Sequence, residues 1–143
     1  MAGLLLYYIT DRVQFAGDES ARRERWLECI AAAAHAGLDY IQLRERDPSA
    51  RELEELARAA AERVRAAGTP TKLLINSRID IAVAVSADGV HLRADDISAR
   101  QARDVFLRAG VTKAIIGVSC HSAEEVLRAR ADGADFVVFG PVF

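Results

Sequence analysis

The stretch Ala36-Gly-Leu-Asp-Tyr-Ile-Gln-Leu-Arg-Glu-Arg46 joins the end of a helical segment to an apolar run that finishes in polar residues. Glycine commonly follows the last turn of a helix, and the β-branched and aromatic residues after it favour a strand. The same junction recurs at Asp132-Gly-Ala-Asp-Phe136 and, more loosely, at Ala87-Asp-Gly-Val-His91. A repeated helix-to-strand unit predicts a parallel sheet whose strands are connected by right-handed helical crossovers.

The rest of the chain alternates in the same way. Six short apolar runs are predicted strands, at residues 4–10, 40–44, 72–76, 89–92, 114–120 and 135–142. Five stretches rich in Ala, Arg, Glu and Leu are predicted helices, at residues 21–36, 49–67, 78–85, 98–109 and 122–131. Ser49 with Glu52, and Ser122 with Glu125, have the spacing of capping boxes at helix starts. We therefore predict one domain over residues 1–143.

The composition excludes several classes of protein. Of the 143 residues, 51% are hydrophobic and 28% are charged, and 19 basic residues against 21 acidic ones give a formal net charge of −2. This balance argues against a protein that binds nucleic acid through a basic surface. No apolar run reaches the ~18–20 residues of a membrane span. Cys29 and Cys120 match no metal or redox spacing, which predicts a soluble protein of the reducing cytoplasm.

Polar residues follow the apolar part of most predicted strands. They are Thr10, Gln42, Arg44, Arg46, Asn76, His91, Asp96, Ser119 and His121. A site drawn from many strand ends is typical of a TIM (β/α)8 barrel, whereas a doubly wound sheet concentrates its site at one switch point. The glycine fingerprint of dinucleotide-binding folds and the Walker A loop are both absent from the sequence. The sequence thus predicts an α/β fold of the TIM (β/α)8-barrel type, incomplete at six strands and five helices.

Three side chains at the end of the second predicted strand are spaced two residues apart and are therefore expected to point to one face; they are Gln42, Arg44 and Arg46. An amide and two guanidinium groups suit a phosphate or diphosphate, which arginine binds through paired hydrogen bonds. The alternative is a cluster of ion pairs with Glu45 and Asp47. Spacing leaves the two interpretations open.

The ends of the third and fourth predicted strands also allow two interpretations. Asn76 and Ser77 could hold a ligand or cap the next helix. Asp95 and Asp96 could bind Mg²⁺ together with phosphate oxygens, or could simply favour a helix N-terminus. Sequence spacing decides neither case.

At the end of the fifth predicted strand, Ser119 could donate a hydrogen bond to a phosphate, and His121 could transfer protons near neutral pH. A serine and a histidine two residues apart in a strand do not make a catalytic triad. Cys120, between them, is predicted to point away from the barrel interior and to pack.

Six stretches, in order along nearly the whole chain, resemble the thiamine-phosphate synthase and TenI family. They are Leu6-Tyr-Tyr-Ile-Thr-Asp11, Tyr40-Ile-Gln-Leu-Arg-Glu-Arg46, Leu74-Ile-Asn-Ser-Arg-Ile-Asp-Ile-Ala82, Ala87-Asp-Gly-Val-His-Leu92 with Asp96, Ile116-Gly-Val-Ser-Cys-His-Ser122 and Gly133-Ala-Asp-Phe-Val-Val-Phe-Gly-Pro-Val-Phe143. The resemblance implies a (β/α)8 barrel that joins an aminopyrimidine diphosphate to a thiazole phosphate, forming thiamine phosphate and releasing pyrophosphate. It implies Mg²⁺ as the cofactor and small molecules as the partners, while the charge balance and the short apolar runs predict neither a nucleic-acid nor a membrane partner.

The resemblance also implies roles for individual residues. The residues implied to bind substrate are Tyr7, Gln42, Arg44, Arg46, Asn76, His91 and Ser119. Of these, Arg44, Arg46 and Ser119 are implied to act in catalysis on the diphosphate, with Arg46 standing where the family usually has lysine. Asp96 would be a magnesium ligand. Ser77 stands where the family has a second metal-binding aspartate, and Asp95 is the candidate substitute.

Other departures concern the activity within the family. Arg93 and Ala94 replace a Gly-Gln pair beside the metal loop, and Arg93 could either supply charge for the diphosphate or obstruct it. Arg-Glu-Arg at 44–46 and Asn-Ser-Arg at 76–78 lean toward the TenI branch, some of whose members are thiazole tautomerases. Pro141 stands where the tautomerase has its catalytic histidine, and proline cannot transfer protons. This residue disfavours the tautomerase.

The family barrel has two more strands than this sequence predicts. Six parallel strands do not close an eight-stranded barrel, and the first and last strands would be exposed edges. Either the chain is a fragment or another chain completes the sheet, and we expect this chain to be inactive by itself and to form a homo-oligomer. The resemblance implies that the parent protein is a thiamine-phosphate synthase-like transferase. The alternatives are a TenI-like tautomerase or regulatory protein, or a non-catalytic partial barrel that binds phosphate.

Overall fold

The strands lie side by side in the order of the sequence. The computed structural model describes residues 3–142 and contains a six-stranded sheet of order β1-β2-β3-β4-β5-β6, with each neighbouring pair parallel. The strands are β1 (Tyr7–Ile9), β2 (Tyr40–Leu43), β3 (Lys72–Asn76), β4 (Gly89–Leu92), β5 (Ile115–Cys120) and β6 (Phe136–Phe139). The helices are η1 (Arg12–Gln14, a 3-10 turn), α1 (Glu19–His35), α2 (Ala50–Ala67), α3 (Ile79–Ala84), α4 (Ala99–Arg108) and α5 (Ala123–Ala131). Residues 1, 2 and 143 of the predicted domain lie outside the described part of the chain, and with them the last residue of the sixth family-like stretch.

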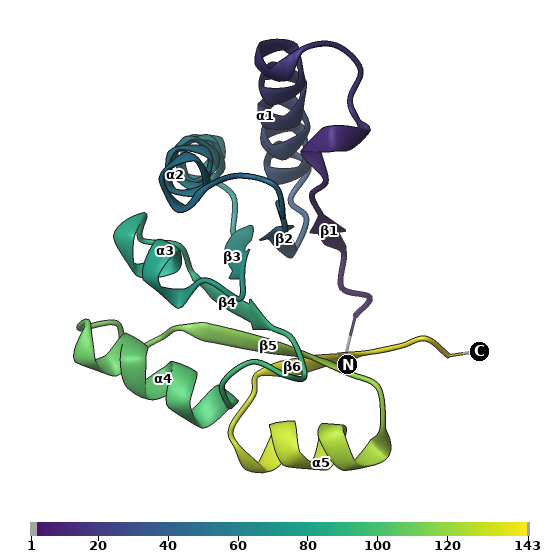
Figure 1. The fold of residues 1–143 in the computed structure, drawn as a ribbon, viewed down its shortest axis with the longest axis vertical. Helices are drawn as coiled ribbons and strands as arrows, with labels where there is room; N and C mark the ends of the chain where they lie inside the picture. The colour runs from purple at the N-terminus through teal and green to yellow at the C-terminus, as the bar shows by residue number, and fades with distance from the viewer. Residues whose placement is uncertain (1–2, 143) are drawn as a thin grey trace.

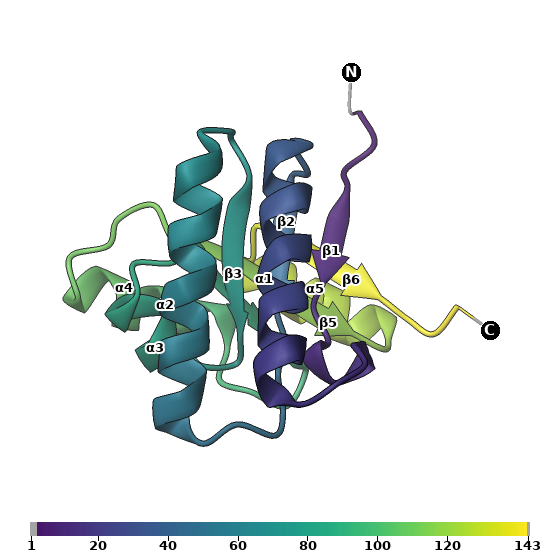
Figure 2. The ribbon, with the colours of Figure 1, turned by 90° about the horizontal axis from the view of Figure 1, so that it is seen from above.

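The sheet is curved, and the helices lie on its convex side. In Figure 1, strands β1 to β6 follow an arc, and the α-helices surround that arc from outside. Figure 2 shows α1 and α2 side by side across the first three strands. This half-barrel of six parallel strands and five α-helices confirms the predicted fold class.

Full capping boxes start helices α2 and α4. Ser49 accepts a hydrogen bond from the backbone N–H of Glu52, whose carboxylate accepts one from the backbone N–H of Ser49, so the predicted capping box is confirmed. Ser98 forms a second full box with Gln101. Each cap satisfies backbone donors that the first helical turn leaves free, which is typically worth about 1 kcal/mol.

The capping box predicted at the start of α5 is half formed. Ser122 accepts from the backbone N–H of Glu125, but the Glu125 carboxylate accepts from the backbone N–H of His121 instead of that of Ser122. The extended backbone before this helix presents a different donor, so the reciprocal bond is made one residue earlier. Helix α1 begins at Glu19, two residues before its predicted start, because Asp18 caps it.

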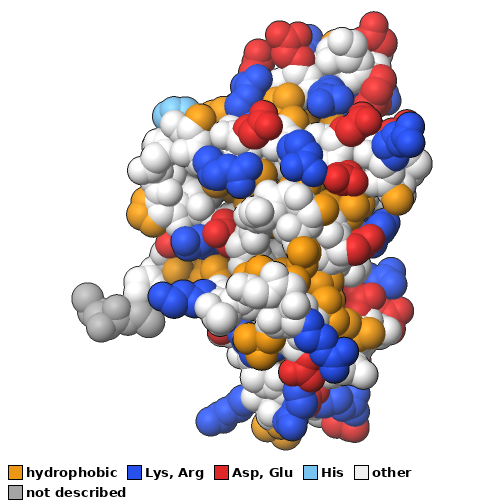
Figure 3. Space-filling model, turned by 90° about the vertical axis from the view of Figure 1, so that its left-hand side faces the viewer, with side chains coloured by type: hydrophobic (Ala, Val, Ile, Leu, Met, Phe, Trp, Pro, Cys, Tyr) orange, Lys and Arg blue, Asp and Glu red, His pale blue; other side chains and the backbone are white. Residues whose placement is uncertain are grey.

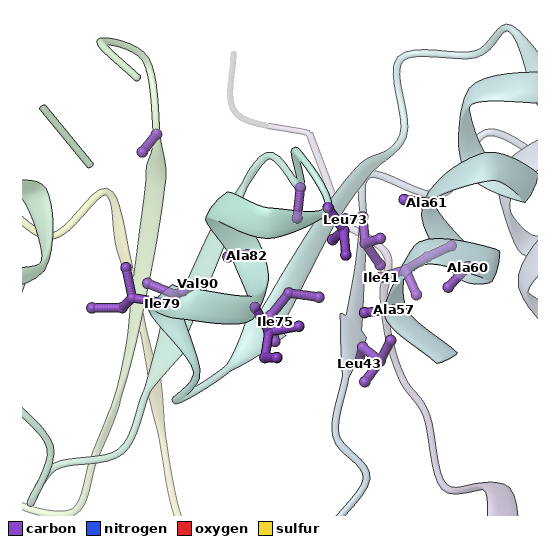
Figure 4. Close-up of a cluster of buried hydrophobic side chains, with 14 of the residues drawn as sticks. Ile41, Leu43, Ala57, Ala60, Ala61, Leu73, Ile75, Ile79, Ala82 and Val90 are labelled. Carbon is purple, nitrogen blue, oxygen red and sulfur yellow. The ribbon is translucent and has the colours of Figure 1, made fainter. Parts of the chain in front are cut away.

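Alternate residues of the strands form the core beneath the helices. In β2 and β3, the side chains that point to the helical side are at most 2% exposed (Figure 4); they are Ile41, Leu43, Leu73 and Ile75. Small residues of α2 (Ala57, Ala60 and Ala61) lie against them and allow the helix to pack closely. Burying each such aliphatic side chain contributes about 1.5–3 kcal/mol, so this layer holds the helices to the sheet.

The concave side of the sheet carries a different set of side chains. Because successive strand residues point to opposite faces, the neighbours of the core residues face inward. They include Tyr7, Gln42, Asn76, His91, Ser119 and Phe136. Cys120, the next residue after Ser119, is fully buried in the core on the other face, as predicted.

The outer surface is mixed in charge. Figure 3 shows basic and acidic side chains interspersed over the helix-covered face, in keeping with the near-zero net charge. Within residues 3–142, no helix is long and apolar enough to cross a membrane.

Candidate active site

A chain of hydrogen bonds crosses the concave face from β2 to β5. Gln42 Nε2 donates to the hydroxyl of Tyr7 at 2.9 Å, and that hydroxyl lies 2.7 Å from His91 Nδ1. The other ring nitrogen of His91 lies 2.8 Å from the hydroxyl of Ser119. Four residues predicted to bind substrate are therefore joined into one network, although they come from four different strands.

Burial keeps this network uncharged. It lowers the pKa of His91 from 6.5 to about 4, so that the imidazole is neutral at pH 7. Burial also raises the pKa of Tyr7, although the hydrogen bond from Gln42 opposes this change. A neutral imidazole has one N–H donor and one acceptor. When the Tyr7 hydroxyl donates to Nδ1, the Nε2–H donates to Ser119, and the serine proton is then free for a ligand.

Gly117 makes room for this arrangement. A Cβ at residue 117 would lie 2.4 Å from the ring of Phe136 and 3.0 Å from His91 Nδ1. The Phe136 ring packs on Tyr7, Tyr40 and His91, with ring centroids 5.2–5.9 Å apart. These aromatic contacts hold Tyr7 and His91, two members of the network, against Phe136.

The network opens into a cavity of about 120 Å³ at the C-terminal ends of the strands. Its lining residues are Ile9, Gln42, Arg44, Asn76, His91, Arg93, Ser119 and Val138. An adjoining hollow of about 400 Å³ shares Ile9 and Arg44 with it and is also lined by Arg46. A larger hollow of about 520 Å³ lies over α1 and α2, away from the strand ends, and is lined mainly by charged surface residues.

Arg44 and Arg46 have no acidic partner among residues 3–142. Their neighbours Glu45 and Asp47 pair instead with Arg12, at 3.0 and 2.7 Å. The proposed alternative, in which the strand-end arginines are neutralised by those two carboxylates, is therefore wrong. Both guanidinium groups are exposed and available to an anion.

Arg12 is a residue that sequence reasoning missed. Its side chain is 3% exposed, and that of Glu45 is 1% exposed. Glu45 also accepts hydrogen bonds from the Thr10 hydroxyl and the Arg12 backbone, each at 2.7 Å. Burial raises the pKa of Glu45, and the hydrogen bonds from Thr10 and Arg12 oppose that change. The hydrogen bond from Arg12 lowers the pKa of Asp47. This cluster ties the loop after β1 to the end of β2, the segment that carries Arg44 and Arg46.

The carboxylate of Asp96 is occupied by donors from the protein. Its Oδ2 accepts from the Ser77 hydroxyl at 2.6 Å and from the Arg93 backbone N–H at 2.8 Å. Its Oδ1 lies 3.5 Å from the guanidinium of Arg93. Asp95 is 77% exposed and lies 3.4 Å from the same guanidinium.

These residues do not fit a magnesium ion as they stand. Mg²⁺ takes oxygen ligands in an octahedral shell, usually including one or two carboxylates. Asp96 is the one partly buried carboxylate here, and one of its oxygens already accepts two hydrogen bonds from the protein. The Arg93 guanidinium would also repel a divalent cation at Asp96. The predicted ligand roles of Asp96, Ser77 and Asp95 gain no support from this geometry.

The capping interpretation is wrong for the end of β3. The N-cap of α3 is Arg78, and no side chain caps that helix, so neither Asn76 nor Ser77 does. Ser98, not Asp95 or Asp96, caps α4. Asn76 lines the cavity, as expected of a ligand-binding residue.

Ser119 and His121, two residues apart at the end of β5, have different partners in the structure. Ser119 meets His91, whereas the ring of His121 hydrogen-bonds to the carbonyl of Gly140 and does not line the cavity. The structure does not bring His121 to the candidate site. The cavity adds Ile9 and Val138, which were not predicted to bind substrate, and Arg93, for which the sequence left open whether it supplies charge for the diphosphate or obstructs it. The inward positions of Ile9 on β1, of Val138 on β6 and of Arg93 directly after β4 follow from the same period of two.

A half-barrel of parallel strands, with cationic and hydrogen-bonding side chains gathered at the strand ends, defines a protein of the α/β-barrel class. The chain matches the family model described as thiamine monophosphate synthase over residues 6–143. The chain therefore belongs to the thiamine monophosphate synthase family.

Individual relatives agree with this assignment. A putative thiamine-phosphate synthase from Geobacter sulfurreducens is 44% identical over 138 residues, which are 96% of this chain and 59% of that protein. A thiamine-phosphate synthase from Caldanaerobacter subterraneus is 41% identical, with the same coverage. The solved structure of thiamine phosphate pyrophosphorylase from Pyrococcus furiosus superposes with a TM-score of 0.77 at 31% identity, covering 98% of this chain and 61% of that one. The chain thus spans about three fifths of the length of these relatives.

Proposed function

We propose that the protein is a thiamine-phosphate synthase, which joins an aminopyrimidine diphosphate to a thiazole phosphate and releases pyrophosphate. One observation carries the proposal beyond family membership. Two arginines at the end of β2 have no acidic partner in the described chain, and Arg44 shares a cavity with the polar network that ends at Ser119. Such a site matches a diphosphate better than it matches a neutral ligand.

The chemistry makes limited demands on the protein. The bond between the pyrimidine methylene carbon and the diphosphate oxygen breaks, and its electron pair leaves with the diphosphate. The thiazole nitrogen then donates its lone pair to the resulting pyrimidine cation. Negative charge develops on the departing diphosphate, so preorganised cations and hydrogen-bond donors beside it lower the barrier.

Each residue of the site has a role in this scheme. Arg44 and Arg46 would hold the diphosphate and stabilise the charge that develops on it, and Ser119 would donate a hydrogen bond to a phosphate oxygen. Gln42 and Asn76 would contact the same substrate from the neighbouring strands. His91 would act as a neutral positioning residue for Ser119, since burial keeps its pKa far below 7. We infer no general base.

The test is a calorimetric titration of the protein with the aminopyrimidine diphosphate. We expect wild-type binding, and we expect Arg44→Ala to weaken it by about tenfold or more, the scale of a charge-assisted hydrogen bond. Arg100→Gln is the matched control, because Arg100 is an exposed arginine on α4, outside the cavity. Absence of binding, or equal affinity of Arg44→Ala and wild type, would contradict the proposal. Cytoplasmic location and homo-oligomeric assembly stay predictions.

A further inference from the structure

Arg93 is a cavity residue for which the proposed reaction has so far no role. It follows β4 directly, and its side chain lines the same cavity as Arg44, although β3 separates their two strands. The side chain is 61% exposed, and its contacts to Asp95 and Asp96 are long, at 3.4 and 3.5 Å. The contact with the exposed Asp95 is weak. Asp96 is 16% exposed but keeps two shorter hydrogen bonds from Ser77 and the Arg93 backbone, so the guanidinium can turn toward an anion without leaving that carboxylate unpaired.

The surroundings of Asp96 favour this role. Two strong donors, the Ser77 hydroxyl and the Arg93 backbone N–H, already converge on one oxygen of its carboxylate. Position 77 supplies a neutral hydroxyl and no second negative charge. A divalent cation would have to displace the serine proton and approach the Arg93 guanidinium, and both changes raise its free energy of binding.

We propose that Arg93 takes the electrostatic place of a metal ion at this strand end, so that Arg93 and Arg44 bind the diphosphate from two sides without Mg²⁺. A guanidinium offers a planar pair of N–H donors that match two phosphate oxygens, and it stays charged at all working pH values. Asp96 and Ser77 then position the segment that carries Arg93 and do not act as metal ligands. This inference rests on the proposed function for its choice of anion.

The probe for the test is inorganic pyrophosphate, titrated calorimetrically into the protein in EDTA and again with Mg²⁺ in excess. We expect wild-type affinity in EDTA to lie within about threefold of that with Mg²⁺. Arg93→Gln should weaken binding in EDTA by about tenfold or more, because it removes a charge-assisted contact. Arg100→Gln, which alters an exposed arginine with a similarly long ion pair to Asp132, should leave the affinity unchanged.

A second variant is designed to replace the guanidinium at this strand end by a magnesium site. Ser77→Asp combined with Arg93→Gly supplies a second carboxylate and removes the competing guanidinium. Residue 77 has a φ of 61°, a conformation that aspartate tolerates better than most residues. We expect this double variant to bind pyrophosphate weakly in EDTA and to recover at least about tenfold in affinity when Mg²⁺ is added. Circular dichroism melts of each variant would verify that the fold is kept.

The outcomes separate the two proposals. Pyrophosphate binding that needs Mg²⁺ in the wild type, or that is indifferent to Arg93→Gln, overturns the role of Arg93 and leaves the synthase proposal standing. A double variant that binds in EDTA as the wild type does would overturn it as well. No binding by the wild type in either buffer would overturn both this inference and the diphosphate site of the proposed function.

Discussion

His91 is a single side chain whose protonation the fold controls strongly. Its pKa is about 4 in the folded protein against 6.5 in an exposed histidine, because it is buried. Between these two values the unfolded chain binds a proton that the folded protein does not, so stability falls as the pH drops from about 6.5 to about 4. Each unit of pKa difference is worth about 1.4 kcal/mol, so the difference between the two pKa values lowers the free energy of unfolding by about 3 kcal/mol at low pH.

Urea unfolding at pH 7 and at pH 4.5 measures this effect. We expect the wild type to lose stability between pH 7 and pH 4.5. The His91→Gln variant should be less stable than the wild type at pH 7, but its loss of stability over the same interval should be smaller by about 2 kcal/mol. His35→Gln, at an exposed position near the end of α1, should lose as much as the wild type. Equal losses in all three proteins would show that His91 is not protonated on unfolding in this range.

The buried ion cluster around Arg12 gives a second prediction for one side chain. Arg12→Ala leaves the Glu45 carboxylate, 1% exposed, without its cationic partner. Removing one member of a buried pair typically costs 3–5 kcal/mol, and we expect about 3 kcal/mol because Glu45 keeps its bond from Thr10. Arg58→Ala, which breaks an exposed pair with Glu54, should cost no more than about 0.5 kcal/mol.

A double-mutant cycle checks the mechanism of that loss. Combining Arg12→Ala with Glu45→Gln should cost less than the sum of the single changes, since each removes the same interaction. Additive losses would mean that Arg12 stabilises the protein through contacts other than Glu45, such as those to Glu19 and Asp47.

The sequence predicted several of the polar side chains that face the cavity, but it did not predict which charges neutralise one another. The period of two places Gln42 and Arg44 on one face, and the structure puts both in the cavity. The partner of Glu45 could not be found in this way, because Arg12 lies 33 residues earlier and reaches it through the fold. Local spacing therefore left the free arginines and the ion-pair cluster as equal alternatives.

Strands β4 and β5 approach each other closely at one glycine. A Cβ at residue 89 would lie 1.8 Å from the carbonyl oxygen of Ile115, which is backbone of the neighbouring strand and cannot swing aside. We predict that Gly89→Ala destabilises the protein by about 3 kcal/mol or more, because the strands must separate. Gly3→Ala, where nothing lies within 4 Å, should be nearly neutral in the same urea titration. Equal stability of Gly89→Ala and wild type would contradict this close approach.

Helices and strands were predictable where short-range signals mark their ends. The glycines at helix ends all have positive φ, which is the conformation expected of that position; they are Gly37, Gly68, Gly110 and Gly133. The half-formed capping box at Ser122 shows the limit of such signals. Whether Glu125 turns back to its own helix depends on the preceding backbone, and no pattern of residues encodes that.

The molecule as a whole is held in its arc by contacts that no local pattern predicts. Alternation of helices and strands predicts a parallel sheet, but an open sheet and a barrel share that alternation. The aromatic cluster shows the curvature of the sheet. The ring of Phe136 on β6 packs on Tyr7 of β1, although β1 and β6 are the two edge strands. No pattern in the sequence indicates that Tyr7 and Phe136 are in contact, because they are 129 positions apart and only the folded sheet brings them together.

Removal of the Phe136 ring tests whether the curvature of the sheet also keeps the pKa of His91 low. Phe136→Ala removes contacts to Tyr7, Tyr40 and His91, and we expect a loss of about 2 kcal/mol, below the range for a fully buried ring because Phe136 is partly exposed. Water would then reach His91, so its pKa should rise from about 4 toward 6.5, as followed by NMR titration of the ring protons. Phe139→Ala, on the same strand but outside the cluster, is the control. An unchanged pKa of His91 in Phe136→Ala would mean that the neighbouring strands bury the imidazole without help from β6, and that the curvature contributes nothing to its neutrality.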